Sequence, residues 1–355
     1  MEETEKRELI AISPEWSIPQ LQEKIADAIT GDGPALASTP TEIKFVSAQT
    51  CLVVNTSGST GEPNSVAIST AALIASTNAA HKYLGAVPGD AWSLLLPTEH
   101  IAGLNVIARA TALGTKVIDN RNVAEYVDAD FISIVPTQLH RALTSDAKLL
   151  EHLTAAEAVL VGGGPISDAL KKQAADKHVK VVTTYGMTEM CGGCVYNQKP
   201  LEGVEIEINS AGLIKLKAPM MASDYLNNSA QWQSLISDGW FQTSDIGELV
   251  DGKLKVLGRA DDVINSGGEK ISVTAVELLF NSHFPNQPVI AFGLPDEEWG
   301  ERLCLGVTTN LTLAQAQQKL NGKNSPKEIY IFNEIPRGAL GKLDRAAAKR
   351  LALGK

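Results

Sequence analysis

The chain contains 355 residues, of which 31 are Lys or Arg and 41 are Asp or Glu, so its formal net charge is −10. This length predicts about two domains with a well-packed core, and the acidic balance argues against a general binder of nucleic acid, whose affinity would come from neutralising phosphates. The sequence has no run of about 18 apolar residues and begins with an acidic segment, so we expect a cytoplasmic protein without a signal peptide or membrane insertion.

Apolar periodicity up to Pro200 predicts alternating strands and helices, which is typical of an α/β fold. A helix is expected over 71–84. Short apolar strands are expected over 116–119, 131–135, 158–161 and 179–184. The segment 166–177 has the pattern of an amphipathic helix, with Ser167 or Asp168 near its N-cap. Because this helix would connect two strands, we predict a βαβ unit and a parallel, covered sheet.

After Pro200 the pattern changes to antiparallel strands and then to a small α+β lobe. Hairpins are expected for 204–208 with 213–217 and for 248–250 with 253–257, the second around the turn signal Asp251-Gly252. In the lobe, helices are expected over 274–281 and 344–353, and strands over 289–293, 303–308 and 328–332. We therefore predict a large N-terminal domain of layered parallel and mixed sheets over 1–258, a connection at 259–262, and a C-terminal lobe over 263–355.

The sharpest local pattern is a loop rich in Ser, Thr and Gly directly after the apolar strand 51–54. It reads Asn55-Thr-Ser-Gly-Ser-Thr-Gly-Glu-Pro63. Its hydroxyls and its backbone N–H groups can surround one anion, because the glycines carry no side chain that would block the approach. The spacing is neither that of a Walker loop nor that of a hydrolase nucleophile elbow. The loop predicts a phosphate cradle, with a simple polar turn as the alternative.

The four cysteines do not form a disulfide framework in a chain of this length. Cys51 and Cys304 stand alone in apolar stretches, where a thiol usually packs as a small hydrophobe. Cys191-Gly-Gly-Cys194 has the spacing of half a zinc site or of a redox dithiol. No second Cys or His pair in the sequence completes the four ligands of structural zinc. We interpret Cys191 and Cys194 as small residues that line a pocket.

Seven further motifs follow the phosphate loop in order. They are Leu96-Pro-Thr-Glu-His100, Val161-Gly-Gly-Gly-Pro165, Thr184-Tyr-Gly-Met-Thr-Glu189, the segments 239–247 and 258–264, Ser266-Gly-Gly-Glu269 and Pro336-Arg-Gly-Ala-Leu-Gly-Lys342. This ordered set resembles the adenylate-forming superfamily of acyl-CoA synthetases, peptide-synthetase adenylation domains and luciferases. The resemblance runs from about Cys51 to Arg345, and several motifs in order are far more specific than any one.

The resemblance implies an ATP site in the large domain, with Mg²⁺ as the cofactor. The implied ATP and AMP contacts are Thr56, Ser57, Gly58, Ser59, Thr60, Gly61, Gly162, Gly163, Gly164, Tyr185, Gly186, Thr188, Asp245 and Arg259. Tyr185 would stack on the adenine, Thr188 would bond the α-phosphate, and Glu189 would hold Mg²⁺ through the phosphates. Asp245, assisted by Arg259, would bind the ribose hydroxyls.

The resemblance also implies two half-reactions, with catalytic roles for Lys342, His100, Thr188 and Glu189. Lys342 would stabilise the charge between the incoming carboxylate and the α-phosphate, although taken alone the segment is typical of a solvated lysine. Asp261 matches the hinge about which the small lobe rotates after adenylation in relatives. The rotation would bring Gly267 and Gly268 beside the channel for the pantetheine arm of coenzyme A.

The segments that line the acyl pocket resemble those of the short o-succinylbenzoate–CoA ligases, particularly actinobacterial ones. The implied acyl and CoA pocket comprises His100, Thr137, Gln138, Gly163, Gly186, Met187, Cys191, Cys194, Gly267 and Gly268. The resemblance implies that 2-succinylbenzoate, ATP and CoA are the substrates, in menaquinone biosynthesis. Another aryl- or short-acyl-CoA ligase, and an adenylation protein that loads a carrier protein, stay open as alternatives.

Three points are left open by the sequence. The motifs supply no dedicated cation for the second carboxylate of the acid, for which Arg109 and Arg141 are candidates. Asn64 stands where relatives usually carry Lys, which predicts weaker handling of ATP or pyrophosphate, or an inactive nucleotide-binding remnant. Homodimer formation is also undecided.

Overall fold

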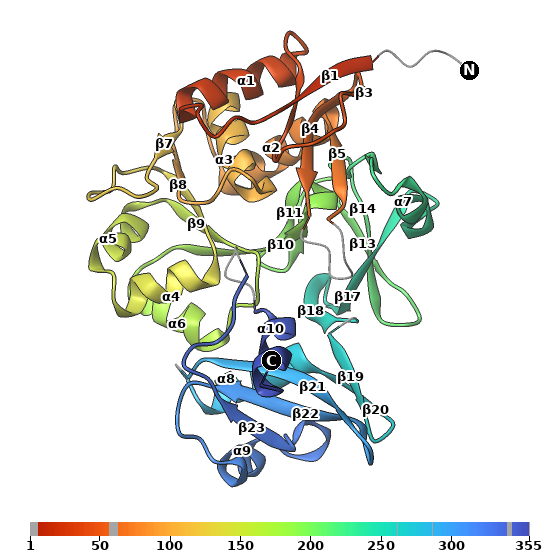
Figure 1. The fold of residues 1–355 in the computed structure, drawn as a ribbon. Helices are drawn as coiled ribbons and strands as arrows, with labels where there is room; N and C mark the ends of the chain where they lie inside the picture. Colours follow the sequence, from red (N-terminus) through yellow and green to blue (C-terminus); the bar gives the residue numbers. More distant parts are fainter. Residues whose placement is uncertain (1–5, 57–62, 261, 286, 339–342, 355) are drawn as a thin grey trace. The chain divides into compact units, whose positions relative to one another are not determined.

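The computed structural model describes residues 6–56, 63–260, 262–285, 287–338 and 343–354 (Figure 1). The chain divides into two compact units. The N-terminal unit comprises 1–163, 173–206 and 216–242, and the C-terminal unit comprises 164–172, 207–215 and 243–355. None of the described helices has both the length and the apolar character that a membrane crossing requires.

The first sheet of the N-terminal unit has six strands in the order β15-β5-β4-β2-β1-β3. The strands are β1 Lys6–Ala11, β2 Ala35–Ala37, β3 Phe45–Ser47, β4 Thr50–Asn55, β5 Ser65–Ser69 and β15 Asp224–Tyr225. β4 is the apolar strand that was expected before the Ser/Thr/Gly loop, and β5 pairs antiparallel with it. Both ends of that loop are therefore fixed in one sheet.

The second sheet of this unit has seven strands in the order β12-β11-β10-β9-β8-β6-β7. The strands are β6 Trp92–Leu94, β7 Ile118–Asp119, β8 Phe131–Ile134, β9 Ala158–Val161, β10 Val181–Met187, β11 Gly192–Tyr196 and β12 Lys199–Pro200. β6 to β10 are parallel to their neighbours, and β11 returns antiparallel to β10. The predicted parallel sheet is confirmed, with β7 shorter and β10 longer toward its carboxyl end than the sequence indicated.

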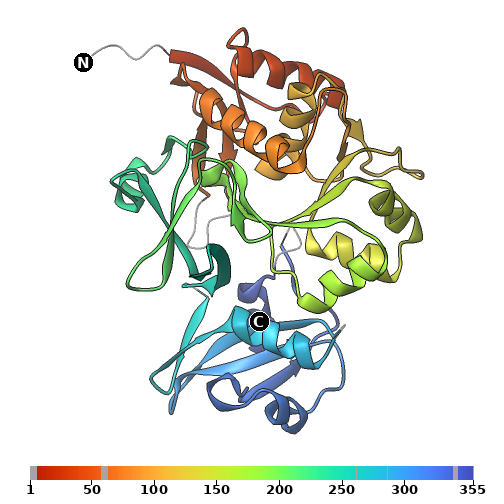
Figure 2. The ribbon, with the colours of Figure 1, turned by 180° about the vertical axis from the view of Figure 1, so that it is seen from behind.

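Helices cover these sheets. In the N-terminal unit they are α1 Ile18–Thr30, α2 Thr70–Leu84, α3 Ile101–Ala112, α4 Pro136–Thr144, α5 Ala147–Ala155 and α7 Ser229–Leu235. α2 contacts β4 and β5 of the first sheet and β11 of the second, and α1 and α3 pack against it (Figure 2). The predicted helix over 71–84 is confirmed as α2, because Ser69 caps its start through the Ala72 N–H and left-handed Gly85 ends it.

The third sheet contains both predicted hairpins. Its order is β13-β14-β17-β16, with β18 paired to β17, and the division between the two units falls within β13, β14 and β17. The strands are β13 Glu205–Ile208, β14 Leu213–Lys217, β16 Ile236–Ser237, β17 Trp240–Val250 and β18 Lys253–Arg259. Asp251 and Gly252 connect β17 to β18 with φ of 50° and 71°, as a two-residue hairpin turn requires. The predicted helix between β9 and β10 is α6 Asp168–Asp176, and Ser167 Oγ accepts from its Leu170 N–H at 3.2 Å.

The last sheet lies in the C-terminal unit and has the order β20-β19-β22-β21, with β23 paired to β22. Its elements are β19 Val263–Ser266, β20 Glu269–Ser272, α8 Val273–His283, β21 Val289–Asp296, β22 Gly300–Val307, α9 Leu313–Lys319, the 3₁₀ turn Gly322–Asn324, β23 Glu328–Ile331 and α10 Arg345–Ala352. One face packs on α8 and α9 around Phe280 and Leu305, and the other packs on α10 around Phe292 and Ala348. The α/β class is confirmed, and Leu343 packs with α10 against this core.

Candidate active site

Four groups of the site residues expected in the N-terminal unit follow the same edge of the seven-stranded sheet. Because β6, β8, β9 and β10 are parallel neighbours, their carboxyl ends lie at the same edge. These ends lead to His100, to Thr137 and Gln138, to Gly162 and Gly163, and to Tyr185, Gly186, Met187, Thr188 and Glu189. Open α/β sheets bind ligands at this edge. The topology thus collects four motifs that are well separated in the sequence.

Gly162 and Gly163 follow β9 directly beside β10. The register pairs Val161 with Thr183, and a Cβ on Gly162 would lie only 2.2 Å from Thr184 Oγ1. Gly163 has a φ of +80°, which a residue with a side chain adopts only with strain. A larger residue at Gly162 would disturb the part of β10 that leads into Tyr185, and one at Gly163 would strain the backbone.

Gly186 lies at an irregularity of β10, where the pairing with β11 shifts between Tyr185 and Gly186. A Cβ on Gly186 would lie 1.9 Å from the carbonyl oxygen of Gly192, so the two backbones touch at this point. The chain then enters the 3₁₀ turn Thr188–Met190. Close backbone contact at Gly186 therefore sets where Thr188 and Glu189 emerge.

Glu189 is held by a tyrosine that the sequence reasoning did not identify. The Tyr225 hydroxyl donates to Glu189 Oε1 at 2.6 Å, and the Ala222 N–H donates to the Glu189 carbonyl at 2.8 Å. Burial, together with the negative charge of Glu189, raises the pKa of Tyr225, so the hydroxyl keeps its proton and acts as the donor. Tyr225 reaches this place because β15 pairs with β5, and no local pattern reveals that pairing.

The ends of the predicted phosphate cradle are fixed by side-chain and backbone bonds. The Thr56 N–H donates to the Asn64 carbonyl at 3.0 Å. Asn227 accepts from the Ser65 N–H and donates to the Pro63 carbonyl, each at 2.8 Å. Ser57, Gly58, Ser59, Thr60 and Gly61 lie outside the described residues, so the cradle itself stays a prediction.

Gln138, which was expected at the acyl pocket, connects two loops at this edge. Its Oε1 accepts from the Val135 N–H at 3.0 Å, and its Nε2 donates to the Leu95 carbonyl at 3.1 Å. The amide of Gln138 thus links the segment that follows β6 to the segment that follows β8. His100 occupies the N-cap of α3 without a side-chain cap bond and is partly buried, as are Thr137 and Met187.

Cys191 and Cys194 are completely buried. Burial raises the pKa of each thiol to about 12, so both are neutral at physiological pH. The Cys191 carbonyl accepts from Ser76 Oγ at 3.2 Å and from Asn105 Nδ2 at 2.8 Å. In this position the two residues act as small packing groups beside β10.

Arg109 is a buried cation on α3, with 4% of its surface exposed. Its Nη2 donates to the Tyr196 hydroxyl at 3.1 Å, its guanidinium lies 5.0 Å from the centre of the Trp92 ring, and its Nε has no hydrogen-bond partner. Among the described residues no carboxylate pairs with it. Burial, with Arg109 as the second cause, lowers the pKa of His81 to about 4, so this neighbour is neutral. A fully buried arginine is normally paired with a carboxylate, whereas the contacts of Arg109 among the described residues are a hydroxyl and an aromatic ring.

The remaining predicted residues belong to the C-terminal unit, Gly164 among them. Asp245 of β17 pairs in register with Arg259 of β18, and Arg259 Nη1 lies 3.7 Å from Asp245 Oδ1, so the structure brings the two together. Gly267 and Gly268 form the turn between β19 and β20, with φ of +62° and +82°. Asp261 and Lys342 lie outside the described residues.

Comparison with known proteins places this site in a family. The family model described as AMP-binding enzyme matches residues 2–222. The chain is 34% identical to a "Probable 2-succinylbenzoate--CoA ligase" of Mycobacterium tuberculosis, over 95% of both chains. It superposes on a variant of E. coli MenE with bound OSB-AMS with a TM-score of 0.74 and 25% identity, over 96% of this chain and 81% of that one. O-succinylbenzoate coenzyme A synthetase (MenE) from Bacillus subtilis, in complex with ATP and magnesium ion, shares the fold at 23% identity and a TM-score of 0.73, over 92% and 81%.

Proposed function

The chain belongs to the AMP-binding enzyme family, and on this premise we propose that it is an AMP-forming ligase that joins 2-succinylbenzoate to coenzyme A. The reaction is a step of menaquinone biosynthesis. The observation that carries the proposal is the match to the mycobacterial ligase, which extends over 95% of both chains. The gathering of the motif residues at the carboxyl edge of the seven-stranded sheet supports it.

The first half-reaction forms an acyl-adenylate. A carboxylate oxygen of the acid attacks the α-phosphorus of ATP, a new P–O bond forms, and pyrophosphate leaves with the electrons of the broken bond. Thr188 would bond the α-phosphate, and Tyr185 with Gly162 and Gly163 would hold the adenine. Asp245, with Arg259, would bind the ribose. This activation is needed because a free carboxylate is a poor electrophile.

Glu189 is the residue that fits a magnesium ion. Its carboxylate is a hard oxygen ligand, as Mg²⁺ prefers, and the Tyr225 hydroxyl orients it through Oε1. The Bacillus subtilis relative was solved with ATP and magnesium ion. When bound, the ion would neutralise charge on the phosphates. Tyr225 would act through Glu189, by holding its carboxylate in place for the ion.

We propose that Arg109 binds the second carboxylate of 2-succinylbenzoate. Its guanidinium is buried, and the described residues give it no carboxylate partner. The other candidate, Arg141, is half-exposed, and its Nε already lies 3.3 Å from Asp146 Oδ2. A ligand carboxylate would complete the pairing that the buried guanidinium lacks.

In the second half-reaction the sulfur of coenzyme A attacks the carbonyl carbon of the acyl-adenylate, and AMP leaves as the C–O bond to phosphate breaks. We propose that the lobe over 263–355 moves about Asp261 between the two steps, which would present the Gly267–Gly268 turn to the thiol. Proline at the hinge fixes φ and restricts the preceding residue. Asp261→Pro is therefore expected to retain adenylation within about threefold and to lower thioester formation by about 100-fold or more. Separate assays of each half-reaction measure this, and unchanged rates in both would contradict the hinge.

The substrate is tested by following pyrophosphate release, AMP and thioester over a panel of carboxylic acids. The proposal expects 2-succinylbenzoate to be preferred, and activity with a different acid but not this one would refute that substrate. Hydroxylamine separates the alternatives. An adenylating protein that loads a carrier makes hydroxamate but no CoA thioester, whereas a nucleotide-binding remnant with Asn64 in place of lysine makes neither.

A further inference from the structure

The C-terminal unit contains a buried hydrogen-bond network at the edge of its sheet. β21 is the last strand in the order of that sheet, so some of its backbone groups have no neighbouring strand. At Ala291 both groups are satisfied by side chains. The N–H donates to Glu277 Oε1 of α8 at 2.8 Å, and the carbonyl accepts from Arg345 Nε of α10 at 3.2 Å. The two side chains thus meet at one residue of the edge strand.

Arg345 and Glu277 also bond each other directly. Arg345 Nη2 lies 3.0 Å from each oxygen of the Glu277 carboxylate, and Glu277 is 4% exposed. Burial raises the pKa of Glu277 to about 7, and Arg345 opposes this rise. The guanidinium therefore offsets part of the cost of burying this carboxylate in its charged form.

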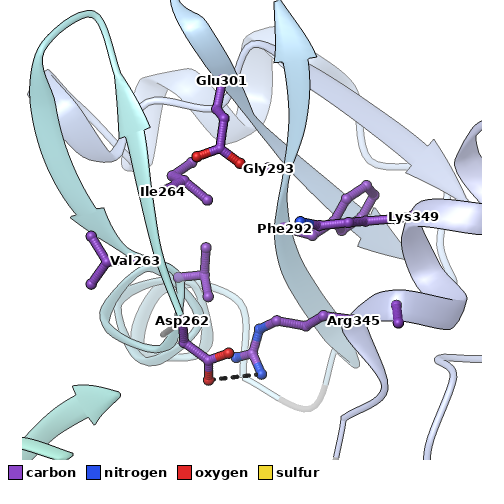
Figure 3. A pocket seen from close by; sticks show the side chains of 10 residues that line it. Asp262, Val263, Ile264, Phe292, Gly293, Glu301, Arg345 and Lys349 are labelled. Atoms are coloured by element: carbon purple, nitrogen blue, oxygen red, sulfur yellow. Dashed lines mark ion pairs between the residues drawn. The ribbon is translucent and has the colours of Figure 1, made fainter. Parts of the chain in front are cut away.

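The same arginine borders a cavity of about 240 Å³ (Figure 3). On this side Arg345 Nη1 lies 3.2 Å from Asp262 Oδ2, at the start of the strand that follows Asp261. Lys349, one helical turn after Arg345, lines the same cavity. All three guanidinium nitrogens of Arg345 thus have contacts: Nε and Nη2 contact core residues, and Nη1 contacts Asp262 at the cavity.

Arg345 is also only three residues after Lys342. The chain on either side of the segment 338–342 is drawn together, because Arg337 and Leu343 form an antiparallel bridge and the Asp344 N–H donates to the Pro336 carbonyl at 2.9 Å. Asp344 then caps α10 through the Ala347 N–H at 2.9 Å. Glu277 also acts electrostatically on Arg337, at the other end of the segment. The network therefore interacts with the chain on both sides of the segment that contains Lys342, through Arg337 before it and Arg345 after it.

We propose that Arg345 is a positioning residue for adenylation, which anchors the base of the Lys342 segment to Glu277 and Ala291 in the core of the C-terminal unit. The inference rests on the proposed ligase reaction, in which Lys342 acts in the first half-reaction. A displacement of about 1 Å of a catalytic group can cost about 100-fold in rate. Arg345 would thus influence the chemistry without touching the substrate.

The test compares Arg345→Met with Lys349→Met, its matched control on the same side of α10. Arg345→Met is expected to lower kcat of adenylation by about 10- to 100-fold with the KM for ATP and acid within about twofold, because binding contacts are retained. Thioester formation from supplied acyl-adenylate and coenzyme A should stay within about threefold of wild type, since Lys342 is not needed there. Lys349→Met is expected to resemble wild type in both assays, and Arg345→Lys to lie between, because it keeps the charge but loses the fork.

A double variant separates positioning from general loss of structure. If Arg345 acts through the lysine, Lys342→Ala combined with Arg345→Met should adenylate no more slowly than Lys342→Ala alone. Multiplied losses, or equal losses in both half-reactions, would overturn the proposal, as would wild-type adenylation by Arg345→Met. Because Arg345→Met leaves a buried carboxylate unpaired, Glu277→Gln with Arg345→Met serves as the second variant that avoids this charge.

If the proposed function is wrong, the wild-type protein will adenylate none of the acids in the panel. In that case hydrogen exchange at the Asp344 amide decides the inference. Faster exchange in Arg345→Met than in Lys349→Met supports the anchor, and equal exchange overturns it.

Discussion

Replacing Lys342 by Ala is expected to lower acyl-adenylate formation by about 100- to 1,000-fold and to leave conversion of supplied acyl-adenylate into thioester nearly unchanged. The ammonium would stabilise charge that develops between the acid and the α-phosphate only in the transition state of the first step. Pyrophosphate release measures that step, and thioester appearance from synthetic acyl-adenylate measures the second. The effect should fall on kcat, with little change in the KM for ATP.

The matched control is Lys349→Ala, which removes a cation from α10 but leaves Lys342 in place. It should adenylate like wild type. Comparable losses in both half-reactions of Lys342→Ala would argue against the assigned role. Equal losses in the two lysine variants would indicate that general positive charge, and not one placed ammonium, matters.

Replacing Arg109 by Met is expected to lower kcat/KM for 2-succinylbenzoate by about 30- to 5,000-fold, because truncating one partner of a buried charge pair costs about 2–5 kcal/mol. Activity with an aromatic acid that lacks the second carboxylate should change by less than about threefold. The comparison of these two acids measures selectivity directly. Arg141→Met serves as the control, since Arg141 is half-exposed and already near Asp146.

The unliganded stability of the Arg109→Met variant adds an independent readout. A buried cation without a carboxylate partner is costly, so an apolar side chain of similar length should leave Tm at or above the wild-type value. Equal activity losses with both acids, accompanied by a lower Tm, would show that Arg109 serves the fold and not the choice of substrate.

Local patterns in the sequence were sufficient for the elements that are buried on both faces. β9 is a continuous apolar run, β8 departs from one only at Ser133, and α2 has a Ser cap and a closing Gly, so their positions follow from short-range chemistry. The β21–β22 hairpin extends to Asp296 and Gly300, beyond the predicted ranges, because its outer residues include Pro, Gly and charged residues and show no regular apolar pattern. Pairings between distant strands, such as β15 with β5, have no local signal at all.

The same distinction between local patterns and distant contacts applies to the residues of the active site. The ordered motifs indicated Tyr185, Glu189 and Asp245, and the family match confirms the resemblance on which they rest. Tyr225 and Asn227 escaped prediction because they act through contacts with residues far away in the sequence. Gln138 was expected at the acyl pocket from its motif, yet whether its amide bonds backbone or ligand depends on the distance to Leu95, which only the fold provides.

The division of the chain has a consequence for synthesis on the ribosome. Every residue of the N-terminal unit precedes Thr243, so that unit can fold while most of the C-terminal unit is still being made. Two short segments, 164–172 and 207–215, belong to the later unit although they are translated early. Lys342 is translated after the whole N-terminal unit. A nascent or clipped chain that ends before Pro336 would thus keep the parallel-sheet edge, with Tyr185 and Glu189, while lacking the lysine proposed for turnover.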